Sequence, residues 1–234
     1  MKVLLCFYLL LCTAVVESNP SEKIKKESDS TQRFGSLKKL WSMSLMPLAH
    51  SADVRHFYRL YGIHKILALS IGGDLSPIRL AGLFNPSELE VVGTDIHPIS
   101  SRTYPHPPNF SFYRQDNNEP FIFPQKSFQI ITLRCGLCVC EKPYWWWQPF
   151  RTCAGLIVRE KVLENFFSKI LNLLDKENVR SYAALDGCLD EMTERTIRLS
   201  LKKTLEHNPL WGAEIMRNQD GLSAGVLFAR REMF

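Results

Sequence analysis

The sequence predicts a three-layer α/β domain whose sheet is mostly parallel and ends in an antiparallel β-hairpin. Two observations predict it. Short apolar runs alternate with amphipathic helical segments along most of the chain, and the end of the chain has the pattern of two strands around a turn. Such alternation is typical of a parallel sheet with helices on both faces. The 234 residues, 45% hydrophobic and 23% charged, suit one domain with a full core.

The N-terminus differs in composition from the rest. Residues 1–18 resemble a secretory signal peptide or a short anchor, because Lys2 precedes an apolar run that is short for a membrane span. A buried first helix is the structural alternative. Residues 19–32 are polar and predict a flexible linker, so the folded domain is expected over residues 33–234. We therefore expect an exported or membrane-associated protein. A cytoplasmic-facing anchor is the alternative, because lysines follow the apolar run.

Helices come first in the expected domain, followed by strands. Apolar residues recur at helical spacing over residues 34–61, and Pro47 divides this stretch into two helices. A buried strand at 65–71, a helix at 74–84 and strands at 89–96 and 109–115 should follow. Residues 97–108 (HPISSRTYPHPP) are too few and too rich in proline for a helix, so a loop is expected there.

The second half continues the alternation and then departs from it. The expected elements are a strand at 128–133, a helix at 162–175, a weaker strand at 179–185, a helix at 189–207 and hairpin strands at 212–217 and 222–230. The hairpin adds an antiparallel strand to an otherwise parallel sheet. This addition is unusual and narrows the candidate folds.

Chemistry-bearing residues follow the first two strands of the predicted sheet. In doubly wound sheets, ligands bind outside the carboxyl ends of the strands. The turn at Gly72 and Gly73 lets the backbone approach a ligand closely, and Asp95 can accept hydrogen bonds from both hydroxyls of a ribose. The alternative is a plain turn and a helix-capping aspartate. The turn lacks the GxGxxG spacing of NAD-binding proteins and places Asp74 where a phosphate would lie, so a ligand without phosphates fits better.

A third stretch adds to these two. Residues 113–133 (YRQDNNEPFIFPQKSFQIITL) have an acidic residue after a strand, an apolar stretch with proline, and then a hydrophobic strand. Together with the turn at 70–74, Asp95 and the closing hairpin, this stretch resembles the class I S-adenosylmethionine-dependent methyltransferases, which have a Rossmann-like fold. The resemblance covers most of residues 61–230.

The resemblance implies S-adenosylmethionine as cofactor and assigns roles to eight residues: Ser70, Gly72, Gly73, Asp95, Ile96, Asp116, Asn117 and Arg134. The first three would line the methionine part of the cofactor. Asp95 would bind the ribose hydroxyls, and Ile96 would pack on the adenine. Asp116, helped by Asn117, would bind the adenine amino group, while Arg134 would lie beside the transferable methyl group.

Two features depart from the family pattern. The glycine-rich turn of the family usually starts with an acidic residue and holds more glycines, whereas Ala68 and Ser70 stand in two of those places. The usual helix between the second and third strands is replaced by a loop. Both departures bear on how tightly the cofactor is held. No catalytic residue is assigned, since methyl transfer is mainly positioning.

The segment after the fourth predicted strand suggests the class of acceptor. It carries three consecutive tryptophans, Trp145 to Trp147, which favour a small or lipid-like methyl acceptor or, equally, a core or membrane-interface plug. Its cysteines, Cys135, Cys138, Cys140 and Cys153, favour disulfides or free thiols over a metal site, because their spacing is irregular for zinc.

The overall charge adds little to the functional prediction. The net charge of +5 comes from scattered residues, so no nucleic-acid partner is expected. Membrane association through the N-terminus is expected.

The sequence as a whole predicts methyl transfer to a small or lipid-like acceptor. The alternative is a non-catalytic Rossmann-like binding or interaction module, because an exported compartment is not an obvious source of S-adenosylmethionine.

Overall fold

The computed structural model describes residues 36–72, 74–97, 105–133, 160–187, 191–217 and 223–234. The fold is that of the unit Leu37–Phe234. In chain order its elements are α2 (Leu37–Leu45), α3 (Ser51–Tyr61), β1 (Lys65–Leu69), α4 (Ser76–Ala81), β2 (Glu90–Asp95), β3 (Phe110–Arg114), β4 (Ile130–Leu133), α5 (Glu160–Leu173), β5 (Tyr182–Asp186), α6 (Glu191–Glu206), β6 (Trp211–Arg217), β7 (Ser223–Arg230) and a short 3₁₀ helix (Arg231–Met233).

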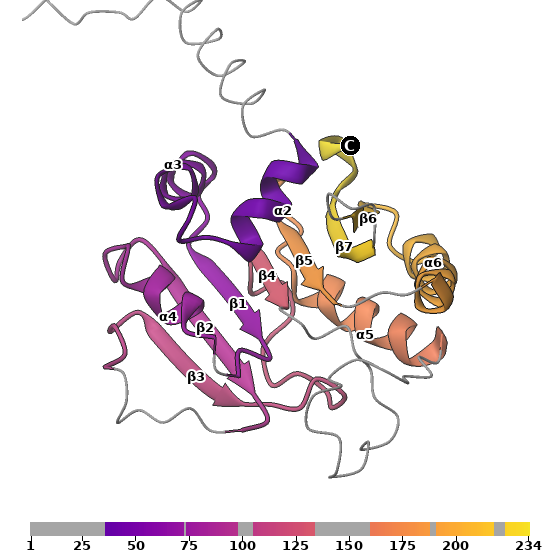
Figure 1. Ribbon diagram of the computed structural model, residues 1–234, viewed down its shortest axis with the longest axis horizontal. Helices are drawn as coiled ribbons and strands as arrows, with labels where there is room; N and C mark the ends of the chain where they lie inside the picture. Colours follow the sequence, from indigo (N-terminus) through magenta and orange to yellow (C-terminus); the bar gives the residue numbers. More distant parts are fainter. Residues whose placement is uncertain (1–35, 73, 98–104, 134–159, 188–190, 218–222) are drawn as a thin grey trace, which may run out of the picture. The chain divides into compact units, whose positions relative to one another are not determined.

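The strands form one sheet in the order β3-β2-β1-β4-β5-β7-β6 (Figure 1). Strands β1 to β5 pair in parallel, whereas β7 is antiparallel to both β5 and β6. Strand β1 lies between β2 and β4, so the strand order reverses direction there. This order and the closing hairpin confirm the predicted class I methyltransferase, Rossmann-like fold.

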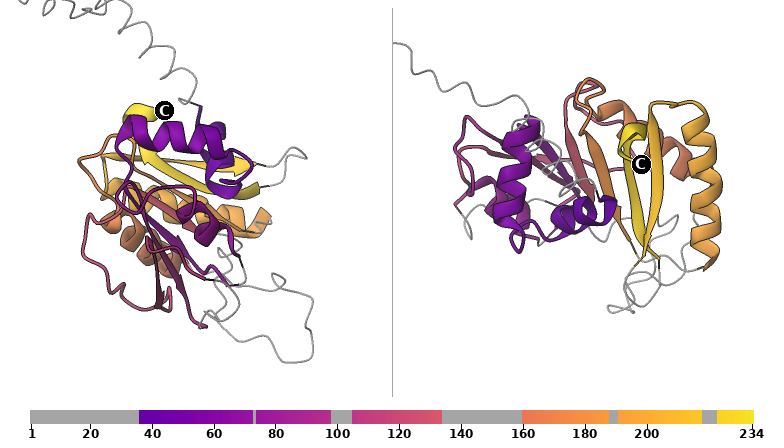
Figure 2. Two further views of the ribbon diagram at one scale, coloured as in Figure 1. Left: turned by 90° about the vertical axis from the view of Figure 1, so that its left-hand side faces the viewer. Right: turned by 90° about the horizontal axis from the view of Figure 1, so that it is seen from above.

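Helices cover both faces of the sheet because its strands are apolar on both sides. Leu67 and Leu69 of β1 belong to the core cluster that α5 and α6 form with one face, where Phe167 and Ile170 are fully buried. Ile66 and Ala68 alternate with them and face the side of α2, α3 and α4. Figure 2 shows the sheet between these two groups of helices.

Most predicted elements are present, with shifted ends. The expected helix over 74–84 is the short α4, which has Pro77 in its first turn and ends at Gly82. Between β2 and β3 no helix occurs in the residues that the structure describes, which are 96–97 and 105–109. The predicted signal and linker, residues 1–32, lie outside the described residues. Among the residues that the structure does describe, no helix is both long and apolar enough to cross a membrane.

Helix α2 packs closely on β5 and β7, at the carboxyl end of β5 and the amino end of β7. Trp41 of α2 is 8% exposed and lies over Gly225 of β7. A Cβ atom added to Gly225 would lie 2.3 Å from the carbonyl oxygen of Leu185 and 2.5 Å from Cη2 of Trp41. Only glycine fits between the neighbouring strand and this indole ring.

Three buried hydroxyl groups meet between helices α2 and α3 and the sheet. The Ser44 hydroxyl lies 2.9 Å from that of Tyr182, and the hydroxyls of Tyr182 and Tyr58 share a further hydrogen bond. Burial raises the pKa of Tyr182 to about 12, although the bonds from Ser44 and Tyr58 partly oppose it. Burial and the neighbouring Tyr182 raise the pKa of Tyr58 well above its usual value. The fold therefore keeps both phenols neutral.

This cluster predicts a loss of stability at high pH. The unfolded chain releases the Tyr182 proton near pH 10, whereas the folded chain keeps it to about pH 12. The contribution of this phenol to the free energy of unfolding is therefore fully present below pH 10. About 2–3 kcal/mol of that free energy is lost as the pH rises from 10 to about 12. Denaturant unfolding at several pH values measures the loss. The Tyr182→Phe variant should lose less between the same two pH values, and an equal loss in both proteins would contradict the assignment to this phenol.

Candidate functional site

The turn after β1 has an unusual backbone shape. Ser70 and Gly72 both have positive φ angles, 51° and 48°, and a serine in this region is uncommon. Ile71 between them is buried, and its N–H donates to the carbonyl oxygen of Thr94 at 3.0 Å. This bond ties the turn to the carboxyl end of β2, so that the Gly72 N–H faces Asp95.

Asp95 ends β2 and is only 8% exposed. Its Oδ2 accepts a hydrogen bond from the Gly72 N–H at 2.8 Å, and its Oδ1 accepts one from the His97 N–H at 2.8 Å. An ionised carboxylate can accept about four hydrogen bonds. Each oxygen of Asp95 therefore keeps one acceptor position, which matches the two donors of a ribose diol.

Asn117 connects the loop after β3 to the turn after β1. Its Nδ2 donates to the Ser70 hydroxyl at 2.7 Å. Its Oδ1 is buried and has no hydrogen-bond partner within the described part of the chain. A buried acceptor without a partner costs free energy, so this oxygen suits a ligand donor such as the amino group of adenine.

Asp116 precedes Asn117 but is exposed. Its Oδ1 accepts hydrogen bonds from the backbone N–H and the side-chain amide of Asn118, at 2.9 and 3.0 Å. The carboxylate thus stabilises a local turn. The predicted contact of Asp116 with adenine stays a prediction, as do the roles predicted for the other site residues.

Apolar side chains lie exposed beside these polar groups. Ile96, directly after Asp95, is 48% exposed, and Tyr113 on the edge strand β3 is 43% exposed. Tyr113 pairs with Thr94 in the strand register, and Ile96 directly follows the last residue of β2, so both lie near the carboxyl ends of β2 and β3. Exposed apolar surface at this place suits a flat base.

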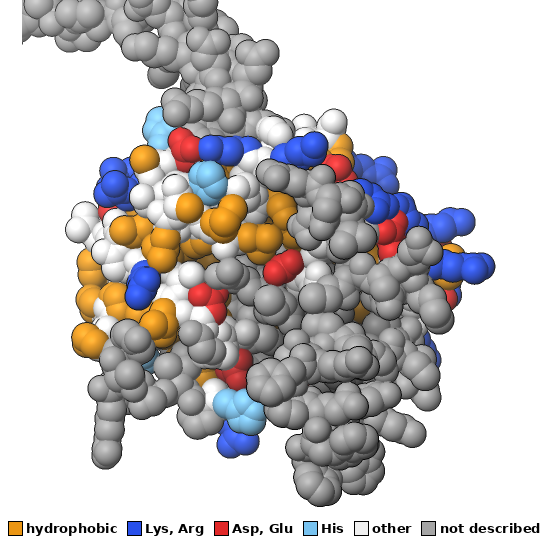
Figure 3. All heavy atoms as spheres, viewed as in Figure 1, with side chains coloured by type: hydrophobic (Ala, Val, Ile, Leu, Met, Phe, Trp, Pro, Cys, Tyr) orange, Lys and Arg blue, Asp and Glu red, His pale blue; other side chains and the backbone are white. Residues whose placement is uncertain are grey.

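Carboxylates lie at or after the carboxyl ends of the first three strands, at the edge of the sheet where these strands end. They are Asp74 in the segment after β1, Asp95 at the end of β2 and Asp116 after β3. Arg114, at the end of β3, also lies at this edge, where its Nε donates to the carbonyl oxygen of Ile96, whereas many Lys and Arg side chains gather over α6 and the last strands (Figure 3). This distribution of charge favours a cationic ligand, such as a sulfonium or an ammonium, over a phosphate.

A narrow cleft lies beneath the turn, between the sheet and helices α2, α3 and α4. Its polar lining consists of the Asp74 carboxylate and the hydroxyls of Ser44, Tyr58, Ser76 and Thr132. Among the residues that the structure describes, Asp74 is the one charged residue of this lining.

Some predicted residues lie outside the described part of the chain. These are Gly73, Arg134, the tryptophans 145–147 and all seven cysteines.

Two residues that hold the loop after β3, Gln115 and Lys169, were not predicted from the sequence. Gln115 is buried and bonds within the loop, whereas Lys169 reaches it from α5. Nothing in the local pattern around Lys169 indicates this contact.

No protein-family model matches the sequence, and no curated protein matches it. Solved structures similar in chain path include the CurJ carbon methyltransferase (12% identity over 71% of this chain and 48% of that chain, TM-score 0.46). Others are the DszA carbon methyltransferase (13%, 88% and 61%, TM-score 0.49) and an S-adenosylmethionine dependent methyltransferase from Mesorhizobium loti (12%, 77% and 98%, TM-score 0.47). The chain spans about half the length of the CurJ chain. At these values the assignment of the fold rests on the strand order and register.

Proposed function

We propose that the protein binds S-adenosylmethionine across the carboxyl ends of β1, β2 and β3 and transfers its methyl group to a small or lipid-like acceptor. The observation that carries this proposal is the set of three open acceptor positions on two residues, Asp95 and Asn117, at this edge. Asp95 keeps one acceptor position on each carboxylate oxygen, and the buried Oδ1 of Asn117 has no partner among the described residues. They come from neighbouring strands, beside the point where the strand order reverses.

The protein's part in the reaction is to bind and orient. Asp95 holds the ribose through two hydrogen bonds, Asn117 accepts one from the adenine amino group, and Ile96 covers one face of the base. Asp74, in the segment after β1, provides a carboxylate for the positively charged end of the methionine part. When bound, S-adenosylmethionine supplies an electrophilic methyl group on a sulfonium. The residues around it would then have to place the acceptor in line with that methyl carbon and exclude water.

The acceptor class rests on the sequence after β4. Three consecutive tryptophans in that segment favour a small or lipid-like acceptor. The second candidate function is a non-catalytic module that keeps the fold and binds another ligand. Ser70 favours it, because this non-glycine residue at a positive φ shows a turn with fewer glycines than methyltransferases of this class usually have.

Calorimetric titration of the full chain, purified in a mild detergent, tests the proposal. S-Adenosylmethionine and S-adenosylhomocysteine should each bind with a dissociation constant on the order of micromolar. NAD should bind far more weakly, because its pyrophosphate would meet the carboxylates of this edge. Absence of binding by both sulfur ligands to well-folded protein would overturn the proposal and favour the non-catalytic module.

A further inference from the structure

The loop over residues 116–122, after β3, carries Asp116 and Asn117, the two residues expected to bind the adenine amino group. It has no regular secondary structure, so its shape depends on the side chains that bind its backbone. Two such side chains stand out. One is Gln115, directly before the loop, and the other is Lys169, which is distant in sequence.

Gln115 holds the loop from its inner side. Its side chain is buried, with the residue 6% exposed. Nε2 donates to the carbonyl oxygens of Asp116 and Pro120, at 2.7 and 3.3 Å. Oε1 accepts a hydrogen bond from the Ile122 N–H at 3.4 Å. One amide therefore binds the beginning, the middle and the end of the loop.

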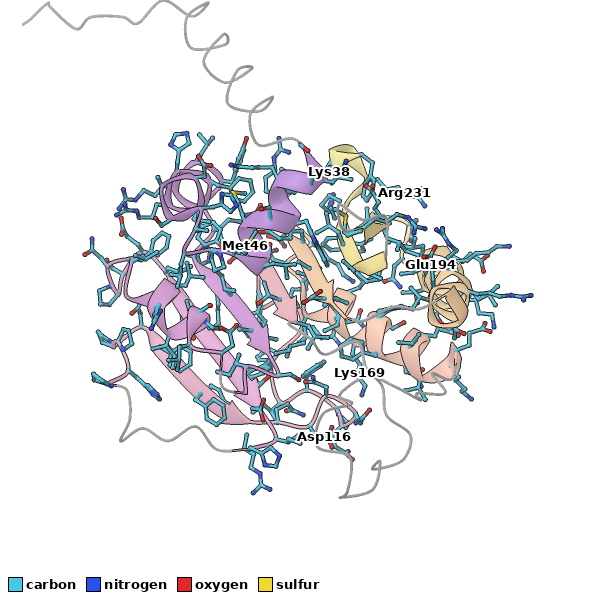
Figure 4. All side chains as sticks on the ribbon, in the orientation of Figure 1. Lys38, Met46, Asp116, Lys169, Glu194 and Arg231 are labelled. Carbon is cyan, nitrogen blue, oxygen red and sulfur yellow. The ribbon has the colours of Figure 1, made fainter. Side chains whose placement is uncertain are left out.

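Lys169 holds the same loop from the side of α5. Its Nζ donates to the carbonyl oxygens of Asn118 and Glu119, at 2.8 and 3.0 Å. Figure 4 labels Lys169 on α5 and Asp116 at the start of the loop. The ammonium makes both bonds charge-assisted, and these are stronger than bonds between neutral groups. The next residue on the helix, Ile170, is fully buried in the core, so the loop is tied to a firmly packed element.

We propose that Lys169 is a positioning residue for the nucleoside end of the cofactor, an inference that rests on the proposed function. Lys169 binds the carbonyl of Asn118, the residue that follows Asn117. Asn117 in turn reaches the Ser70 hydroxyl through its side chain. Without the ammonium, the backbone around residue 118 gains freedom, and the Oδ1 of Asn117 is no longer held where the base amino group arrives. Lys169 itself touches neither the cofactor nor the acceptor in this account.

The test measures how two lysine variants bind two ligands that differ only in their base. Lys169→Met keeps an unbranched apolar chain but removes the ammonium, and Lys161→Met makes the same change at an exposed position of the same helix. The full-length proteins are titrated with S-adenosylhomocysteine and with S-inosylhomocysteine, whose base has a carbonyl in place of the amino group. We expect Lys169→Met to bind S-adenosylhomocysteine about tenfold more weakly and to discriminate less between the two bases. Lys161→Met should match the wild type with both ligands.

The outcomes separate this inference from the proposed function. If the wild type binds neither ligand, the proposed function and the positioning role of Lys169 are both overturned. If the wild type binds S-adenosylhomocysteine and Lys169→Met shows the same dissociation constants and base discrimination, this inference alone is overturned. A variant that only loses folded protein would lower the stoichiometry without changing the discrimination, which also counts against a positioning role. Lys169→Arg, which keeps the charge, should recover part of the affinity and of the discrimination.

Discussion

Replacement of Asp95 by alanine is expected to weaken the binding of S-adenosylmethionine by about a hundredfold or more. On the proposed function, the variant would lose two charge-assisted hydrogen bonds to the ribose, and each such bond contributes about 1.5–3 kcal/mol. About 2.7 kcal/mol corresponds to a hundredfold change in the dissociation constant. Calorimetric titration of the wild type and the variant with the cofactor measures the effect directly.

A matched control separates the ribose contact from a general loss of a capping carboxylate. Asp175 also accepts a backbone N–H, that of Glu177 at 2.9 Å, but it follows α5 near the start of β4, at the opposite edge of the sheet. Asp175→Ala should therefore bind the cofactor like the wild type. Unchanged affinity in a folded Asp95→Ala protein would mean that this carboxylate serves only to hold Gly72 and His97.

Replacement of Gly225 by alanine is expected to give the largest loss of stability, about 3 kcal/mol or more. The added methyl group would lie 2.3 Å from the Leu185 carbonyl oxygen and 2.5 Å from the Trp41 ring. The backbone of β5 has little room to move, so the strand pair and α2 must separate, and such overpacking is costly. For a domain of this size, the melting temperature should fall by about 10 °C. Thermal unfolding followed by circular dichroism measures this change.

Gly82→Ala is the matched control for this substitution. A Cβ atom at Gly82 would come no closer than 3.4 Å to another atom, and the φ angle there is −66°. The change in stability should stay within about 0.5 kcal/mol. If Gly225→Ala melts like this control, Trp41 does not pack on the strand pair as described.

The parallel strands were the easiest elements to predict from the sequence. Strands β1 and β4 are buried on both faces, so each appears as a nearly continuous apolar run bounded by polar or glycine residues. The expected strand at 179–185 begins later, at Tyr182. Val179 is apolar but 53% exposed, because Asn178 accepts the Arg180 N–H through its side chain and forms a turn there. Apolar composition alone cannot distinguish such a turn from the start of a strand.

The candidate site could be predicted only where position within the fold decides it. The position of Asp95 could be predicted because a carboxylate at the end of the second strand has a defined place at the sheet edge, while its contact with a ligand stays a prediction. The contact between Asn117 and Ser70 joins residues that are 47 positions apart, and Lys169 lies 51 positions from Asn118. No local pattern encodes contacts of this kind, because they depend on how the strands and α5 are arranged in three dimensions.

The direction of β6 has a consequence for how a protein of this fold can diversify. Strand β7 runs antiparallel to both β5 and β6, so β6 runs in the same direction as β5. The chain therefore leaves β4, β5 and β6 at the edge where it also leaves β1, β2 and β3. The direct contacts proposed for the nucleoside belong to the first three strands and the segments that follow them. On the proposed function, mutation and insertion after Leu133, Asp186 and Arg217 would alter the choice of acceptor without changing Asp95 or Asn117, provided that α5 keeps Lys169 on the loop after β3.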